Sequence, residues 1–70
     1  MDIPIRGETI DLDQFLKLAG IVQSGGEAKH LIQSGAVQVN GSAEARRRAT
    51  LNVGDVVRVE NSEFRVTSAA

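Results

Sequence analysis

The sequence predicts an α+β domain, because two helical periodicities are followed by two β-hairpin signals in one short chain. Apolar residues recur at helical spacing over residues 12–19 and again over 28–32. Alternating valines then lead into Asn40-Gly41, the dipeptide best suited to a type I′ hairpin turn. Gly54-Asp55 is a second turn signal and starts a further strand. All 70 residues fit one domain, with a recognisable core at about residues 11–66.

The segment before the first helix is expected to be extended over Ile3–Ile10. Pro4 lacks a backbone N–H and confines any strand here to a sheet edge, and Gly7 offers a break. A strand at the edge of the sheet is therefore the prediction for this segment.

The first helix is predicted to begin after Asp11, which stands where an N-cap should, with Gln14 at the capping-box position. Asp13 lies in the first turn, where a carboxylate is favourable to the helix dipole. Gly20 ends the helix, and Lys17 projects away from its buried side. That buried stripe consists of Leu12, Phe15, Leu16 and Ala19.

The second helix follows after only a few residues, so the two helices should pack as a short αα-hairpin with Ile21 and Val22 at the corner. Ser24 is a good N-cap, and Glu27 three residues later completes a capping box. Gly35 ends the helix. Its buried stripe is Ala28, Leu31 and Ile32, and its opposite side carries Gly26, Lys29 and Gln33.

The last hairpin is predicted to turn at Asn61-Ser62, which places Val57 and Val59 on the core side of the sheet. On the other side, Arg58 would lie opposite Arg65, and each arginine would have a glutamate within diagonal reach. Ser68–Ala70 is predicted to be a frayed end.

Composition excludes several classes of function. The chain has no cysteine and one histidine, His30, so we expect neither a metal site nor any other cofactor. A domain of 70 residues buries little surface, and we expect no enzyme activity. The longest apolar runs are far too short for a bilayer span, and no signal pattern stands at the start. A cytoplasmic, monomeric protein without a membrane partner is expected.

Charge is segregated along the chain although the net charge is only −1. Between Asp13 and Asp55, five cationic residues oppose two glutamates, a balance of +3, whereas the two ends together carry −4. Such asymmetry favours a local anion-binding patch on a protein that stays soluble.

The first candidate site is the start of the second helix, Ser24-Gly25-Gly26, where unpaired N–H groups and the helix dipole favour a phosphate. The alternative is a flexible turn that needs glycine for its backbone angles. Lys29 and Gln33 favour the site, because they lie one and two turns further along the same exposed side.

The second candidate site is Arg46-Arg47-Arg48, which follows the first hairpin. Three adjacent like charges repel one another, and nearby carboxylates are limited to Glu44 and Glu27, so we expect an external anion to neutralise them. The alternative is a solvated basic loop. Lys17 either joins this patch or is solvated, and His30 is expected to be an ordinary surface residue.

Aromatic residues are nearly absent, which bears on the kind of nucleic acid. Phe15 and Phe64 are the only ones, both at predicted core positions, so a base-stacking platform is not expected. Recognition of phosphates and shape remains, the mode expected for folded or duplex RNA.

The ordered set of these signals resembles the alpha-L RNA-binding domain, named for the fourth small-subunit ribosomal protein. The small stand-alone bacterial members of YbcJ type are most similar, since they share Ser-Gly-Gly/Ala before the helix and Glu-x-Arg-Arg after the hairpin, here Glu44–Arg47. The residues that carry the resemblance are Leu12–Leu18, Ala28-Lys29, Ile32, Gly35, Val37-x-Val39-Asn40-Gly41 and Gly54-Asp55-x-Val57.

The resemblance implies two helices packed on a small antiparallel sheet, and binding of ribosomal or transfer RNA, in ribosome assembly or quality control on a ribosomal subunit. Many relatives have an arginine directly after the cap serine, where this chain has Gly25. That contact does not carry over, and the cluster Arg46–Arg48 is the candidate substitute. Two other classes remain open: a β-grasp sulfur carrier, disfavoured because the chain lacks a Gly-Gly tail, and a protein-binding adaptor.

Overall fold

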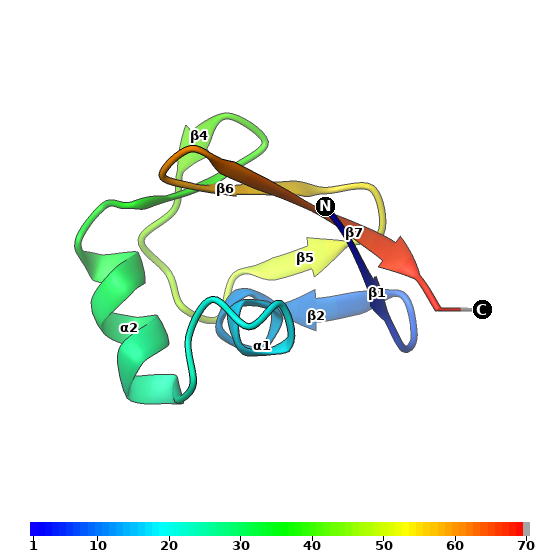
Figure 1. Ribbon diagram of the computed structural model, residues 1–70, viewed down its shortest axis with the longest axis horizontal. Helices are drawn as coiled ribbons and strands as arrows, with labels where there is room; N and C mark the ends of the chain where they lie inside the picture. The colour runs from blue at the N-terminus through cyan, green and yellow to red at the C-terminus, as the bar shows by residue number, and fades with distance from the viewer. Residues whose placement is uncertain (70) are drawn as a thin grey trace.

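The structure, a computed structural model, describes residues 1–69 and contains two helices and short strands (Figure 1). Asp11 and Ser24 both have extended backbone angles directly before a helix, as N-caps require. The elements are β1 (Asp2–Ile5), β2 (Thr9–Asp11), α1 (Leu12–Leu18), α2 (Gly25–Gln33), β3 (Val37–Val39), β4 (Ser42–Ala43), β5 (Thr50–Asn52), β6 (Val56–Val59) and β7 (Ser62–Ser68).

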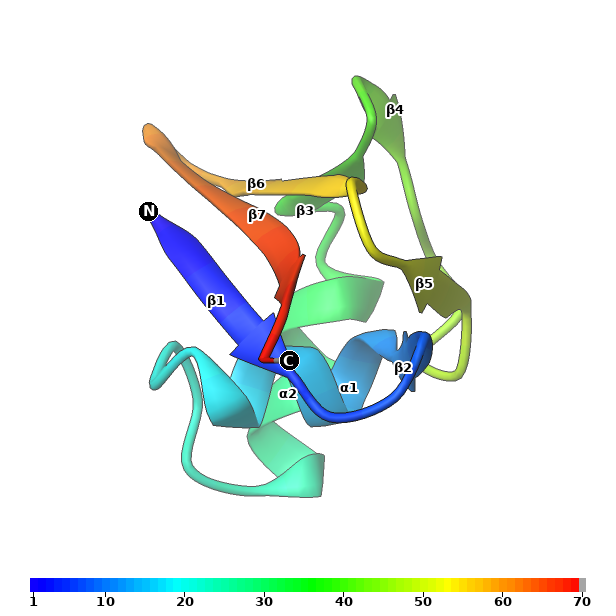
Figure 2. The ribbon, with the colours of Figure 1, turned by 90° about the vertical axis from the view of Figure 1, so that its right-hand side faces the viewer.

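The main sheet has five strands in the order β1-β7-β6-β3-β4, and β2 pairs with β5 in a separate two-stranded ladder. β1 lies at the edge, as Pro4 predicts, but it runs parallel to β7, so the sheet is mixed and not purely antiparallel. Figure 2 shows β1 and β7 side by side above the helices.

The prediction of a frayed end is wrong for the residues described: Ser68 pairs with Ile5, and the Ala69 N–H donates to the Ile5 carbonyl at 3.0 Å. Ala70 lies outside the described residues.

The β6–β7 hairpin turns one position earlier than predicted, since Val59 pairs with Ser62 and the loop is Glu60-Asn61. Glu60 adopts φ +56°, the left-handed region that such tight turns use. The pairing differs from the prediction by two residues, and because side chains alternate with a period of two, the same valines still face the core. Arg58 therefore lies opposite Glu63, with Nη1 3.6 Å from Oε2, and not opposite Arg65.

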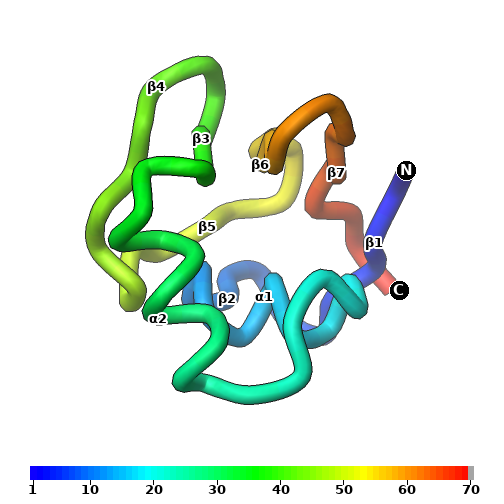
Figure 3. Tube along the Cα trace, turned by 60° about the vertical axis from the view of Figure 1, so that its left-hand side comes forward, coloured from blue at the N-terminus to red at the C-terminus, as the bar shows by residue number. Residues whose placement is uncertain are grey.

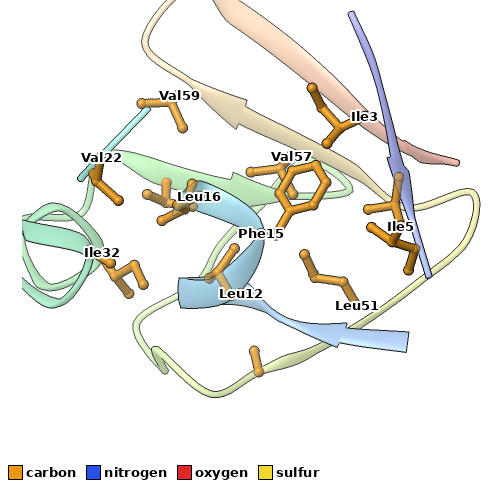
Figure 4. Packing of buried hydrophobic residues seen from close by; sticks show 14 residues of the cluster. Ile3, Ile5, Leu12, Phe15, Leu16, Val22, Ile32, Leu51, Val57 and Val59 are labelled. Atoms are coloured by element: carbon orange, nitrogen blue, oxygen red, sulfur yellow. The ribbon is translucent and has the colours of Figure 1, made fainter. Parts of the chain in front are cut away.

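The hydrophobic core lies between the helices and one face of the main sheet (Figure 3). α1 and α2 pack against each other, with buried Val22 and partly buried Ile21 at the corner between them, as predicted. Figure 4 shows Phe15 pointing into the centre of this layer. The largest fully buried side chains are Phe15, Ile5, Leu12, Leu16, Ile32, Leu51, Val37, Val57 and Val66.

The predicted turns at Asn40-Gly41 and Gly35 form with the expected backbone. Asn40 and Gly41 have φ values of +51° and +86°, and Gly35 ends α2 at +85°. The Asn40 side chain also joins two turns: its Oδ1 accepts from the Val56 N–H at 3.0 Å, and its Nδ2 donates to Asp55 at 3.1 Å. Neither helix, within residues 1–69, has the length and apolar character to cross a bilayer.

Candidate nucleic-acid interface

The start of α2 is an ordered helix terminus. The Ser24 Oγ accepts from the Glu27 N–H at 3.2 Å, the bond that the capping box predicts. Neither Gly25 nor Gly26 has a positive φ, so the interpretation of this dipeptide as a turn that requires glycine for its backbone angles is wrong. The absent side chains instead leave space, and Arg47 lies in it: a Cβ built on Gly25 would be 3.5 Å from Arg47 Nη2.

The arginine loop, defined here as residues 44–49, is fixed to the start of α1 by its backbone. The Leu12 N–H donates to the Ala49 carbonyl and the Asp13 N–H to the Arg47 carbonyl, both at 2.9 Å. These carbonyls satisfy N–H groups that a helix start leaves free. The Asp11 side chain makes no capping bond, so its predicted capping role is filled by the loop.

The three arginines were expected to need an external anion, with only Glu44 and Glu27 as nearby carboxylates, but two of them have partners within the chain. Arg46 forms a bidentate ion pair with Glu44, with Nε 3.2 Å from Oε2 and Nη2 3.4 Å from Oε1, although the Arg46 side chain is 81% exposed. Hydrogen bonds from Arg46 hold the pKa of Glu44 below its usual value, and the same carboxylate raises the pKa of Arg46. The Arg47 Nη2 lies 3.6 Å from Asp13 Oδ2, and its Nε is buried without a hydrogen-bond partner among residues 1–69.

Positive charge nevertheless remains beside the start of α2. Arg48 and Lys29 are exposed, and neither forms an ion pair with a carboxylate within residues 1–69. Lys29 and the exposed Gln33 follow Gly25 along α2 by one and two turns. Lys17 is half-buried in the last turn of α1, at the opposite end from the residues that hold the arginine loop. The structure thus brings Gly25 and Arg47 together, whereas Lys17 lies at the other end of α1 from the arginine loop.

A groove lies along another side of α2 and has the opposite character. Its lining combines apolar side chains with the exposed Glu27, His30 and Glu60. Two carboxylates in the lining disfavour a phosphate chain there. Gly26 also lines this groove. The lining residues are Ile21, Val22, Gly26, Glu27, His30, Leu31, Val59 and Glu60.

Asp13 is the residue of this region that sequence reasoning missed. It was expected to favour the helix dipole, but it is only 5% exposed and faces Arg47. No local pattern could have found this contact, because the two residues lie in different elements and meet only when the loop docks on α1.

Comparisons with known proteins identify the family of this chain. The family model of the S4 domain matches residues 3–67. A Bacillus subtilis (strain 168) protein named "Probable ribosome maturation protein RlbA" is 50% identical over 58 residues, which cover 83% of this chain and 82% of that protein. An Escherichia coli (strain K12) protein named "Putative RNA-binding protein YbcJ" is 40% identical over 48 residues, 69% of each chain.

A solved structure shows the same fold in a longer chain. The 30S ribosomal protein S4e from Thermoplasma acidophilum superposes with a TM-score of 0.64 at 19% identity, over 84% of this chain and 31% of that one. Two helices on a mixed sheet are therefore an arrangement that the S4e chain shares. Together with the match over residues 3–67, the fold and the two relatives show that this chain belongs to the S4 domain family.

Proposed function

We propose that the chain is a non-catalytic RNA-binding protein that recognises structured RNA, ribosomal or transfer RNA, by its phosphates and shape. The observation that carries the proposal is the position of the Arg47 guanidinium beside Gly25, which joins the arginine loop to the start of α2. The names of the two relatives, one a ribosome maturation protein and one an RNA-binding protein, support it. The β-grasp sulfur carrier has no support from the S4 domain match.

The binding surface in this proposal has two parts. One part is the start of α2, Ser24, Gly25 and Gly26, where glycines let a phosphate approach the first N–H groups of the helix. Lys29 adds a point charge one turn on, and Gln33 offers an amide. The other part is Arg46, Arg47 and Arg48, with Lys17 at the margin.

The arginines differ in how they would meet RNA. Arg48 has no carboxylate partner within residues 1–69 and is free to bind a phosphate with its planar fork. Arg46 is bound to Glu44 in an exposed pair, and exposed pairs are weak enough for a phosphate to compete. Arg47 fills the position above Gly25, where many relatives carry an arginine of their own, so it supplies the missing charge from a different part of the chain.

The target in this proposal is a folded RNA on a ribosomal subunit, during assembly or quality control in the cytoplasm. Phe15 is fully buried and Phe64 is half-buried in the sheet, so neither offers a free ring on which an unpaired base could stack. The arginines, Lys29 and the first N–H groups of α2 can instead bind phosphates of an RNA helix or turn.

The test compares two charge reversals of equal size. The double variant Arg46→Glu/Arg48→Glu should weaken binding to deproteinised ribosomal RNA about 100-fold, because two phosphate contacts are lost and repulsion is added. The matched control, Arg58→Glu/Arg65→Glu, changes the net charge equally on the sheet and should weaken binding by less than about threefold. Binding is measured by fluorescence anisotropy at several salt concentrations. Equal losses for both variants, or an affinity that does not depend on salt, would contradict the proposal.

A further inference from the structure

We propose that Asp13 is a positioning residue for RNA binding, because it holds the Arg47 guanidinium beside the start of α2. This inference rests on the proposed function and deepens it. Asp13 is the one buried charged side chain among residues 1–69. A buried carboxylate needs a compensating group, and here that group belongs to the arginine loop.

Asp13 holds Arg47 at two points. Its backbone N–H donates to the Arg47 carbonyl at 2.9 Å, which fixes where the arginine leaves the main chain. Its side-chain Oδ2 lies 3.6 Å from Nη2, which fixes where the guanidinium ends. The same Nη2 lies in the space that the missing side chain of Gly25 leaves. The long side chain is therefore restrained from both ends along one path.

The restraint leaves the hydrogen-bonding capacity of Arg47 largely unused. Charge-assisted N–H···O bonds measure about 2.7–2.9 Å, so the 3.6 Å separation is an electrostatic contact and not a saturated hydrogen bond. The other oxygen of Asp13, Oδ1, accepts from the Gln14 N–H at 2.9 Å and is turned towards the helix. Arg47 Nη1 and Nη2 thus remain able to donate to a phosphate, and the side chain is already ordered before RNA arrives.

A purely electrostatic role for Asp13 predicts the opposite effect on RNA. A carboxylate beside a phosphate-binding surface repels the ligand, so its removal should tighten binding. If Asp13 positions Arg47, its removal should weaken binding although the protein becomes more positive. The sign of the change separates the two roles.

The variant is Asp13→Asn, because asparagine keeps the volume and the oxygen that accepts from Gln14. We expect roughly tenfold weaker binding to deproteinised ribosomal RNA, similar to that of Arg47→Ala, and a shallower salt dependence, since one phosphate contact is lost. In the Arg47→Ala background, Asp13→Asn should cause no further loss. The matched control is Glu44→Gln, which removes the same charge from the exposed Arg46 pair and should leave affinity unchanged or tighter.

The outcomes separate this inference from the proposed function. Absence of RNA binding by the unmodified protein, or an Arg47→Ala variant that binds normally, overturns the role of Arg47 itself. An Arg47→Ala variant that binds weakly, together with Asp13→Asn binding as well as or better than the unmodified protein, overturns only the positioning role.

A measurement on the unmodified chain does not depend on whether a variant folds. The ¹H–¹⁵N heteronuclear NOE of Arg47 Nε should be close to backbone values and well above that of Arg48 Nε. Equal, low values for both arginines would overturn the inference.

Discussion

Arg46 and Arg47 are neighbours in sequence, yet their ion pairs differ in kind. Arg46 reaches Glu44 two residues earlier, in a pair formed by local chain geometry and open to water on the arginine side. Arg47 reaches Asp13 on a different element, and the side chain of Asp13 is buried. The first pair can form in almost any conformation of the loop, whereas the second exists only when the loop has docked on α1. The difference teaches that adjacent arginines of one cluster can have separate roles, one as an adaptable surface charge and one as part of the fold.

The largest expected effect is a difference in the free energy of unfolding between substitutions of Arg47 and Arg46. Arg47→Glu places a second carboxylate against buried Asp13, and should lower the free energy of unfolding by about 2 kcal/mol, less than for a fully buried pair because Arg47 is 38% exposed. Arg46→Glu should shift the urea midpoint little, because its partner is at the surface. Urea denaturation followed by circular dichroism measures both. Equal midpoints for the two variants would remove the distinction.

A smaller effect tests where the Arg47 side chain lies. Gly25→Ala adds a methyl group at an ordinary contact distance from Arg47 and at a helical φ, so it should stabilise the protein by about 0.5 kcal/mol. Gly35→Ala is the control, because Gly35 has φ +85°, and it should destabilise the protein by about 1 kcal/mol. Thermal unfolding of both variants is sufficient. Destabilisation by Gly25→Ala would mean that Arg47 lies closer to the helix than described.

The smallest effect concerns pH and the exposed pair. Hydrogen bonds from Arg46 lower the pKa of Glu44 in the folded protein, so the contribution of this pair is present above the pKa of the unfolded chain and is lost as pH falls through the folded value. Glu44→Gln should therefore reduce the urea midpoint slightly at neutral pH, and this difference should disappear as the pH falls through the folded pKa of Glu44. A difference that persists in acid would show that Glu44 acts through something other than its charge.

Local signals in the sequence predicted the local structure well. The capping pair Ser24 and Glu27 predicted the start of α2, and Asn40-Gly41 predicted the first hairpin, because each depends on residues within one turn of chain. Pro4 correctly placed β1 at a sheet edge. These features follow from backbone geometry and need no knowledge of distant segments.

Pairings between distant segments could not be predicted in the same way. The parallel ladder of β1 and β7 joins the two ends of the described chain, and nothing in either strand specifies its partner. The β6–β7 turn uses Glu60 at positive φ, a conformation that glutamate rarely adopts, so Asn61-Ser62 was the more favourable prediction. Sequence reasoning selected Gly25 and Arg47 as candidate site residues. It could not predict that they lie close together or that Asp13 pairs with Arg47, because both contacts depend on how the arginine loop docks on α1.

The attachment of the arginine loop through main-chain atoms has a consequence for how such a surface can change. The Arg47 and Ala49 carbonyls that accept from α1 exist whatever side chains those positions carry. The course of the loop is therefore largely independent of the residues at positions 46 and 48. Point substitutions there can retune affinity for a new nucleic acid without rebuilding the scaffold, which makes this segment a natural place for diversification and for engineering.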